Sequence, residues 1–355
     1  MLPTVQTVTL IIIAAFTALG SVVNGFIVAV NGIDWVKSRH LNSIDVILTC
    51  LGAARFCFQW GIMLDNILFA VYPDLYNQSE ISNILMFTWV FIEFSSFWFA
   101  CCLSVFYCTK IASFSHPLFI FLKLKIPGIV RWMLLGSVLA SIVTSFSTAW
   151  VYYKEYHSNS TTGLTANDSN LINCTLVWDL CKEHQYNFTK RITLNAGGLN
   201  GVVNFNYLIP VFFLGYSLPF FIFCVAALLL IGSLWSHTWR MKNSSMAFSN
   251  PSLEAHFTAI KVMTSFFLFC AFYFICRILQ TKFWMSGETS WTVVISVGIA
   301  AFPSLHSVIL ILNNCKLRKS WARIFHHGKC PSGRETPKPS IRILNSDHCK
   351  IINSS

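Results

Sequence analysis

Four charged residues stand inside long apolar stretches of the sequence, at Arg55, Asp65, Glu93 and Arg277. A charge in such a stretch is costly unless another group compensates it, so each of them is a candidate for function. An arginine stays protonated and offers five N–H donors, whereas a carboxylate accepts several hydrogen bonds. The chemistry that these residue types indicate is ion pairing and ligand recognition in an apolar interior.

The spacing around Glu93 and Arg277 predicts a binding pocket. Trp89 and Tyr273 precede Glu93 and Arg277 by one helical turn, so each pair shares one face of a helix. Together they would line a pocket that is aromatic with a few polar groups, as small-molecule sites usually are. Two interpretations stay open, because Glu93 either contacts a ligand or simply pairs with Arg277.

A second polar group surrounds Arg55, which needs polar neighbours because it cannot lose its charge. Asn24 and Ser307 are expected at a similar depth on two other helices. We expect these three side chains to form one network, which either holds the helices together or takes part in activation.

The patterns of catalysis are missing from the sequence. It contains no HExxH, GxSxG or Walker motif, and the pair His326–His327 has no companion at metal-ligand spacing. We therefore expect no enzyme, no metal site and no cofactor.

Transmembrane helices are the elements that must position these residues. The chain has 355 residues, of which 55% are hydrophobic and only 11% are charged, and its mean hydropathy is +0.60. Crossing a bilayer takes roughly 20 mostly apolar residues, and a helix satisfies its backbone polar groups within one span. The apolar runs predict an all-α bundle of seven transmembrane helices in residues 1–313, at 7–30, 45–70, 82–111, 129–152, 206–236, 258–282 and 291–313.

Charge placement predicts the topology. With the N-terminus outside, sixteen Lys and Arg residues fall on the cytoplasmic side and five on the outer side, in keeping with the positive-inside rule. The tail, residues 314–355, is then cytoplasmic and begins with a short interfacial helix. Because the net charge of +11 follows this topology, it indicates a multi-pass protein in a lipid bilayer and no nucleic-acid partner. We expect this bilayer to be the plasma membrane.

The outer side carries a long loop, residues 153–205, that is rich in Asn, Ser and Thr. Within the loop, Cys174 and Cys181 lie where an oxidising compartment would permit a local disulfide, and whether they form one stays open. Glycosylation motifs of the Asn-X-Ser/Thr type fall on the outer side at Asn77, Asn159, Asn167, Asn173 and Asn187.

Five blocks of the sequence resemble the bitter taste receptors (type 2 taste receptors), and the resemblance covers nearly all of residues 20–320. The blocks are NGFIVAVNGIDWVKSRHLNSIDVIL (24–48), FWFACCLSVFYCTKIASFSHPLFIFLK (97–123), SLPFFIFCVAALLLIGSLWSHTWRMK (217–242), NPSLEAHFTAIKVMTSFFLF (250–269) and FPSLHSVILILNNCKLRKS (302–320). The resemblance implies a G-protein-coupled receptor that binds small, mostly apolar bitter compounds in an outward-facing pocket. It also implies a heterotrimeric G protein partner that is gustducin-like and of the inhibitory class.

The resemblance assigns roles to single residues. Ligand positions of the family match Trp89, Glu93, Phe94 and Phe97, and the family's switch aromatic matches Tyr273. Motif positions on the cytoplasmic side, where the G protein engages, match Tyr107, Lys110, His237, His256 and Lys261. Asn187 matches the family's glycosylation site in the second outer loop.

Two other classes of protein remain as alternatives. Vomeronasal-type pheromone receptors share a His-containing seventh helix, but the blocks SLWSHTWRMK and AHFTAIK favour the taste receptors. A transporter or channel would need a polar pathway through the bundle, and the sparse charges do not form one.

Overall fold

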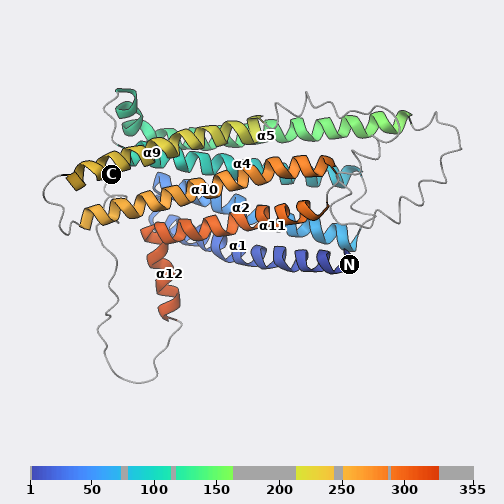
Figure 1. Cartoon of the computed structure of the whole chain (residues 1–355), viewed down its shortest axis with the longest axis horizontal. Helices are drawn as coiled ribbons and strands as arrows, with labels where there is room; N and C mark the ends of the chain where they lie inside the picture. Colours follow the sequence, from blue (N-terminus) through green and yellow to red (C-terminus); the bar gives the residue numbers. More distant parts are fainter. Residues whose placement is uncertain are drawn as a thin grey trace, which may run out of the picture.

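The computed structural model describes residues 2–72, 79–112, 117–162, 213–243, 251–286 and 289–327. Within these ranges the chain forms helices and no β-strand, and the long helices run side by side with alternating directions (Figure 1). They are α1 (Leu2–Ser38), α2 (Ser43–Val71), α4 (Ser79–Ile111), α5 (Pro117–Thr162), α9 (Leu218–Asn243), α10 (Pro251–Ser286) and α11 (Thr289–Asn313). A π-helix, η3 (Phe213–Ser217), precedes α9, and a shorter helix, α12 (Cys315–His327), follows α11. The predicted all-α fold class is confirmed.

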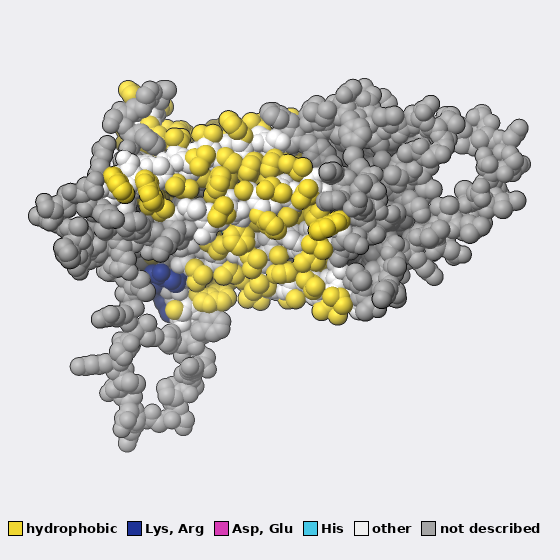
Figure 2. Space-filling model, in the orientation of Figure 1, with side chains coloured by type: hydrophobic (Ala, Val, Ile, Leu, Met, Phe, Trp, Pro, Cys, Tyr) yellow, Lys and Arg dark blue, Asp and Glu magenta, His cyan; other side chains and the backbone are white. Residues whose placement is uncertain are grey.

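The surface of the bundle is suited to lipid. In the described part of the chain, six helices are long and apolar enough to cross a membrane, and α10 adds a shorter apolar stretch, Thr264–Gln280. Figure 2 shows hydrophobic side chains in a broad band across the middle of the described surface. Large apolar residues such as Trp132, Phe221 and Leu268 point outward, which in water would expose far more apolar area than soluble proteins tolerate. The protein is thus a multi-pass membrane protein, while the side that each end faces stays a prediction.

Several helices are longer than the apolar runs from which they were predicted. Helix α1 continues to Ser38, and α5 covers Pro117–Thr162 where the sequence predicts only 129–152. Residues 153–162, expected in the outer loop, are therefore helical. Pro127 stands inside α5, where it removes a backbone hydrogen bond, and Figure 1 shows the first turns of α5 bent away from the bundle.

Helix α4 occupies the centre of the bundle because it packs against α2, α5 and α9. Its residues Phe99, Leu103 and Phe106 belong to a core cluster that also takes Ile27 from α1 and Leu51 from α2. Helix α11 closes the bundle by packing between α1 and α10. A polar residue on the inner face of α4 or α2 is consequently shielded from lipid on every side.

Helix α12 leaves the bundle at a steep angle, at the end opposite the N-terminus (Figure 1). Lys316 anchors its first turn: Nζ lies 3.0 Å from Asp45 Oδ2, 2.8 Å from Asp34 Oδ2 and 2.9 Å from Asn31 Oδ1. Asp45 is buried, so this one ammonium group compensates a carboxylate at the junction of α1 and α2.

We predict that Lys316→Met lowers thermal stability, because Asp45 would lose its cation while it stays buried. An acceptor left unsatisfied in this way costs about 1–3 kcal/mol, and the purified protein should unfold at a correspondingly lower temperature. Lys319→Met is the matched control, since Lys319 is exposed on the same helix. Equal melting temperatures for the two variants would contradict the anchoring role.

Candidate ligand-binding site

Glu93 lies on the inner face of α4 and is almost fully enclosed, with 2% of the residue exposed. Its Oε1 accepts a hydrogen bond of 2.5 Å from the Tyr273 hydroxyl, and its Oε2 pairs with Arg277 Nη2 at 2.7 Å. Both carboxylate oxygens are therefore engaged, as a buried charge requires. The structure brings Glu93, Tyr273 and Arg277 together, while their contact with a ligand stays a prediction.

Arg277 joins this carboxylate to η3, the π-helical segment before α9. Its guanidinium donates hydrogen bonds to the Tyr216 hydroxyl and to Gln280 Oε1. It also lies 5.1 Å from the ring centroids of both Trp89 and Tyr216, within the range of cation–π attraction. The predicted pairing with Glu93 thus exists, but Arg277 is held by aromatic rings as well.

Aromatic side chains form the walls around this ion pair. Phe94 meets Tyr216 edge to face with ring centroids 4.7 Å apart, and the Phe97 ring lies 5.7 Å from that of Tyr273. Trp89 stacks on Phe58 of α2 at 6.0 Å. The predicted aromatic ligand positions on α4 therefore pack against the residues that hold the ion pair, namely Arg277, Tyr216 and Tyr273.

The π-helix η3 sets the position of Tyr216. A π-turn takes one residue more than an α-helical turn, which rotates the following side chains relative to a regular helix. Gly215, which precedes Tyr216, is packed so closely that an added Cβ would overlap the Phe94 ring. The absence of a side chain at this position lets the Phe94 ring lie directly against the backbone and beside Tyr216.

A second network lies deeper in the bundle, around Arg55 of α2. The Arg55 side chain is fully buried, its Nη1 donates to Ser307 Oγ at 3.1 Å, and Ser307 Oγ donates to Asn24 Oδ1 at 2.6 Å. This chain of contacts links α2, α11 and α1 through the three residues that the sequence placed at similar depth. Their role in activation stays a prediction.

The deeper network has further members that were not predicted from the sequence. Arg55 Nη2 bonds to His306 Nδ1, and the Arg55 guanidinium carbon lies 5.6 Å from the Phe302 ring centroid. Gln59, one turn along α2, donates to Ser304 Oγ and to the Phe16 carbonyl. A sequence signal existed for these residues, because Gln59, Ser304 and His306 are polar residues inside apolar runs.

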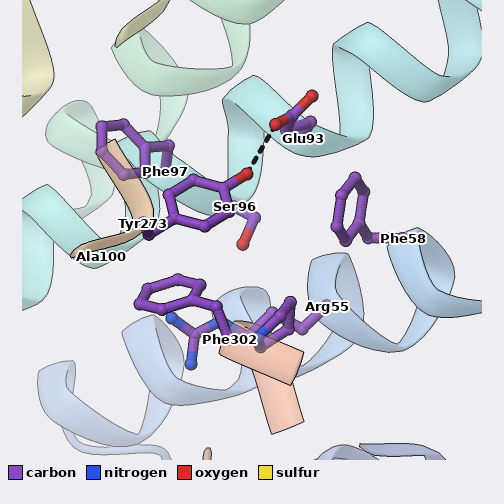
Figure 3. Close-up of a pocket in the computed structure, with 9 residues that line it drawn as sticks. Arg55, Phe58, Glu93, Ser96, Phe97, Ala100, Tyr273 and Phe302 are labelled. Carbon is purple, nitrogen blue, oxygen red and sulfur yellow. Dashed lines mark hydrogen bonds between the residues drawn. The ribbon is translucent and has the colours of Figure 1, made fainter. Parts of the chain in front are cut away.

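A small cavity separates the two networks. Its walls come from α2, α4, α10 and α11, with Arg55 and Phe302 on one side, Glu93 on the other and Tyr273 between them (Figure 3). The remaining lining residues are Phe58, Ser96, Phe97, Ala100 and Pro303. The cavity has room for about one water molecule, so a larger ligand requires that these walls move apart.

The other predicted sites fall near or beyond the edges of the described residues. Tyr107 and Lys110 lie at the end of α4 that faces α12, where Tyr107 packs against the core. His237 lies on α9, and His256 and Lys261 lie on α10, but their side chains lie outside the described part. Asn159 lies on α5, with its side chain likewise outside, and the remaining outer positions, Asn77, Asn167, Asn173, Asn187, Cys174 and Cys181, lie outside altogether.

Comparison with known proteins gives the family. A sequence model described as "Taste receptor protein (TAS2R)" matches residues 1–329. The chain is 33% identical to taste receptor type 2 member 7 of Macaca mulatta over 90% of its length and 93% of the relative's. It is 34% identical to taste receptor type 2 member 2 of Homo sapiens over 89% of its length and 94% of the relative's. It is 32% identical to member 9 of Homo sapiens over 94% of its length and 98% of the relative's.

This chain belongs to the type 2 taste receptor family. The resemblance inferred from its sequence blocks is therefore confirmed, and the chain is a receptor and not an enzyme. Among the described residues of this taste receptor, no group of three or more His, Cys, Asp or Glu side chains could hold a metal ion. The site offers groups suited to binding, an ion pair with aromatic rings beside it.

We predict that Gly215→Ala impairs folding of the receptor, because the new methyl group would push the Phe94 ring away from Tyr216. Overpacking of this kind costs about 1–3 kcal/mol, and surface expression and melting temperature should both fall. Gly232→Ala is the matched control on α9, where an added Cβ meets no atom within 4 Å. If both alanine variants behaved like the parent receptor, the close packing at Gly215 would have no consequence.

Proposed function

We propose that this taste receptor is a G-protein-coupled chemosensor whose pocket, around Trp89 and Glu93, binds small and mostly apolar bitter compounds. The observation that carries the proposal is the Glu93 carboxylate, buried among aromatic rings and shared by Tyr273 and Arg277. A buried charge of this kind is rarely retained in a membrane span without a function. The aromatic walls would take the apolar body of a ligand, and the ion pair would orient its polar group.

The ion pair also suggests how an agonist acts. A ligand with a cationic or hydrogen-bond-donating group would compete with Tyr273 and Arg277 for the Glu93 oxygens. Releasing these contacts frees α10 from α4, because the described hydrogen bonds between these two helices converge on this carboxylate. The ligand shifts the population toward the active state only insofar as it binds that arrangement more tightly.

The signal would travel inward along side chains in contact. Tyr273 stacks on Phe302 with centroids 4.4 Å apart, and Phe302 lies over Arg55, which is bound to His306 and Ser307. Movement of Tyr273 would thus disturb the deeper network.

At the α12 end of the bundle, where Tyr107 and Lys110 lie, the helices would open to a gustducin-like G protein of the inhibitory class. The predicted contacts His237, His256 and Lys261 complete this surface. In the plasma membrane the N-terminus would face outside and the α12 end the cytoplasm. This topology would expose the outer Asn-X-Ser/Thr motifs to glycosylation.

Screening tests the proposed function directly. Cells that express the receptor with a promiscuous G protein are exposed to a panel of bitter compounds, and calcium release is recorded against cells without the receptor. Hits are then tested for nucleotide exchange on purified inhibitory-class G protein. Ligand-driven ion flux in the absence of G protein would instead assign the chain to a channel or transporter.

We predict that Glu93→Gln lowers agonist potency about ten- to a hundredfold for cationic compounds and much less for neutral ones. The amide keeps the size of the side chain and removes its charge, so the variant loses a charge-assisted hydrogen bond to the ligand. Dose–response curves in the calcium assay give the potency ratio, with surface labelling as the expression control.

Arg277→Met separates the two interpretations of Glu93. If Glu93 only pairs with Arg277, Glu93→Gln and Arg277→Met should change the response to every agonist by the same factor. If Glu93 contacts ligand, the two substitutions should act differently on cationic and neutral agonists. Unchanged curves for Glu93→Gln across the panel would remove Glu93 from the pocket.

A further inference from the structure

The charge balance of the deeper network is incomplete. Arg55 is fully buried and permanently cationic, yet among the described residues no carboxylate lies within ion-pair distance of it. Its partners are two neutral groups, Ser307 and His306, and the face of the Phe302 ring. Hydrogen bonds to neutral acceptors do not cancel a charge, so the cation remains without a counterion in the interior of a membrane protein.

One N–H group of Arg55 is left without an acceptor. Arg55 Nε carries a hydrogen and has no hydrogen-bond partner. Arginine is only a donor, so His306 Nδ1 must accept from it, and His306 is then a neutral ring that brings no compensating charge. The Ser96 hydroxyl lines the same cavity as Arg55 and is directed toward the side of Arg55 and Phe302 (Figure 3).

The opposite wall of the cavity does not supply the missing charge. Glu93 lines the cavity, but its carboxylate is already matched by Arg277 at 2.7 Å and by the Tyr273 hydroxyl. Glu93 and Arg277 together are neutral, which leaves the surroundings of the cavity with the positive charge of Arg55. The other lining residues are aromatic or small and carry no charge, so none of them compensates Arg55.

We propose that the cavity between Arg55 and Ser96 binds a small monovalent anion, chloride, as the counterion of Arg55. Arg55 Nε and the Ser96 hydroxyl donate to the ion, and the Phe58 and Phe97 rings exclude water around it. The cavity has space for about one water molecule, so chloride, which is somewhat larger than water, requires a slight outward shift of the cavity walls, and organic carboxylates are excluded. The site lies at the inner side of the proposed agonist pocket but does not depend on agonist binding.

Thermal unfolding of the purified, agonist-free receptor tests this site. At constant ionic strength, replacing sodium gluconate by sodium chloride should raise the melting temperature in a saturable manner, by about 2–4 °C. Bromide should act like chloride because it is also a small halide. An equal melting temperature in chloride and gluconate would overturn the proposal and leave water as the occupant of the cavity.

Variants locate the effect within the molecule. Ser96→Ala should weaken the chloride dependence, and Arg55→Gln should abolish it. Ser95→Ala is the matched control, because Ser95 is the neighbouring buried serine on α4 and does not line the cavity. If Arg55→Gln does not fold, the comparison of Ser96→Ala with Ser95→Ala decides the question. An equal chloride-dependent rise in melting temperature in these two variants would place the ion elsewhere. Retention of the shift in Arg55→Gln would likewise overturn the proposal.

Discussion

A carboxylate buried in the interior of a membrane-spanning bundle must be compensated from within the protein, and in this receptor that carboxylate belongs to Glu93. Tyr273 and Arg277 supply its partners from α10, and Arg277 extends the contact to Tyr216 in front of α9. The need to satisfy one charge thus determines how three helical segments approach each other. The same need explains why the side chains around this ion pair are aromatic. Rings fill the space and attract the guanidinium of Arg277 without competing for the carboxylate.

The two polar networks are connected through a single line of side chains. Glu93, Tyr273, Phe302 and Arg55 follow one another from α4 through α10 and α11 to α2, each in contact with the next. Beyond Arg55 the line continues through Ser307 to Asn24 on α1. Packed interiors have few alternative arrangements, so a change at Glu93 cannot stay local if Tyr273 moves. Most helices of the bundle therefore share one set of interactions, although the polar residues in it are few.

Much of this arrangement could be predicted from the residues alone. Charged groups in apolar runs, one turn from aromatic residues, identified Glu93 and Arg277, and depth along the spans grouped Arg55 with Asn24 and Ser307. Tyr216 could not be placed, because the π-helix before α9 shifts its direction in a way that regular helical spacing does not represent. His306 and Gln59 could be recognised as polar residues inside apolar runs. Their roles could not be predicted, because these depend on which helices are neighbours, and α2 meets α11 only in the folded bundle. The ends of α5 could not be predicted either, because the helix extends beyond the apolar stretch that indicates a membrane span.

The irregular backbone of this receptor lies next to its site. Pro303 lines the cavity and, having no N–H, leaves the carbonyl of Ile299 without its helical partner, which weakens α11 where it passes Arg55. Across the site, η3 replaces the regular helical ladder in front of α9 with a wider turn that carries Tyr216. Regular helices resist bending, so a bundle that must open around a closed cavity will do so where the ladder is already interrupted. Both interruptions flank the contacts of Glu93 and Arg55, so loss of either set of contacts would act on helical segments whose hydrogen-bond ladder is already incomplete. Helix α4, which carries Glu93 through the centre, has neither a proline nor a π-turn among its residues.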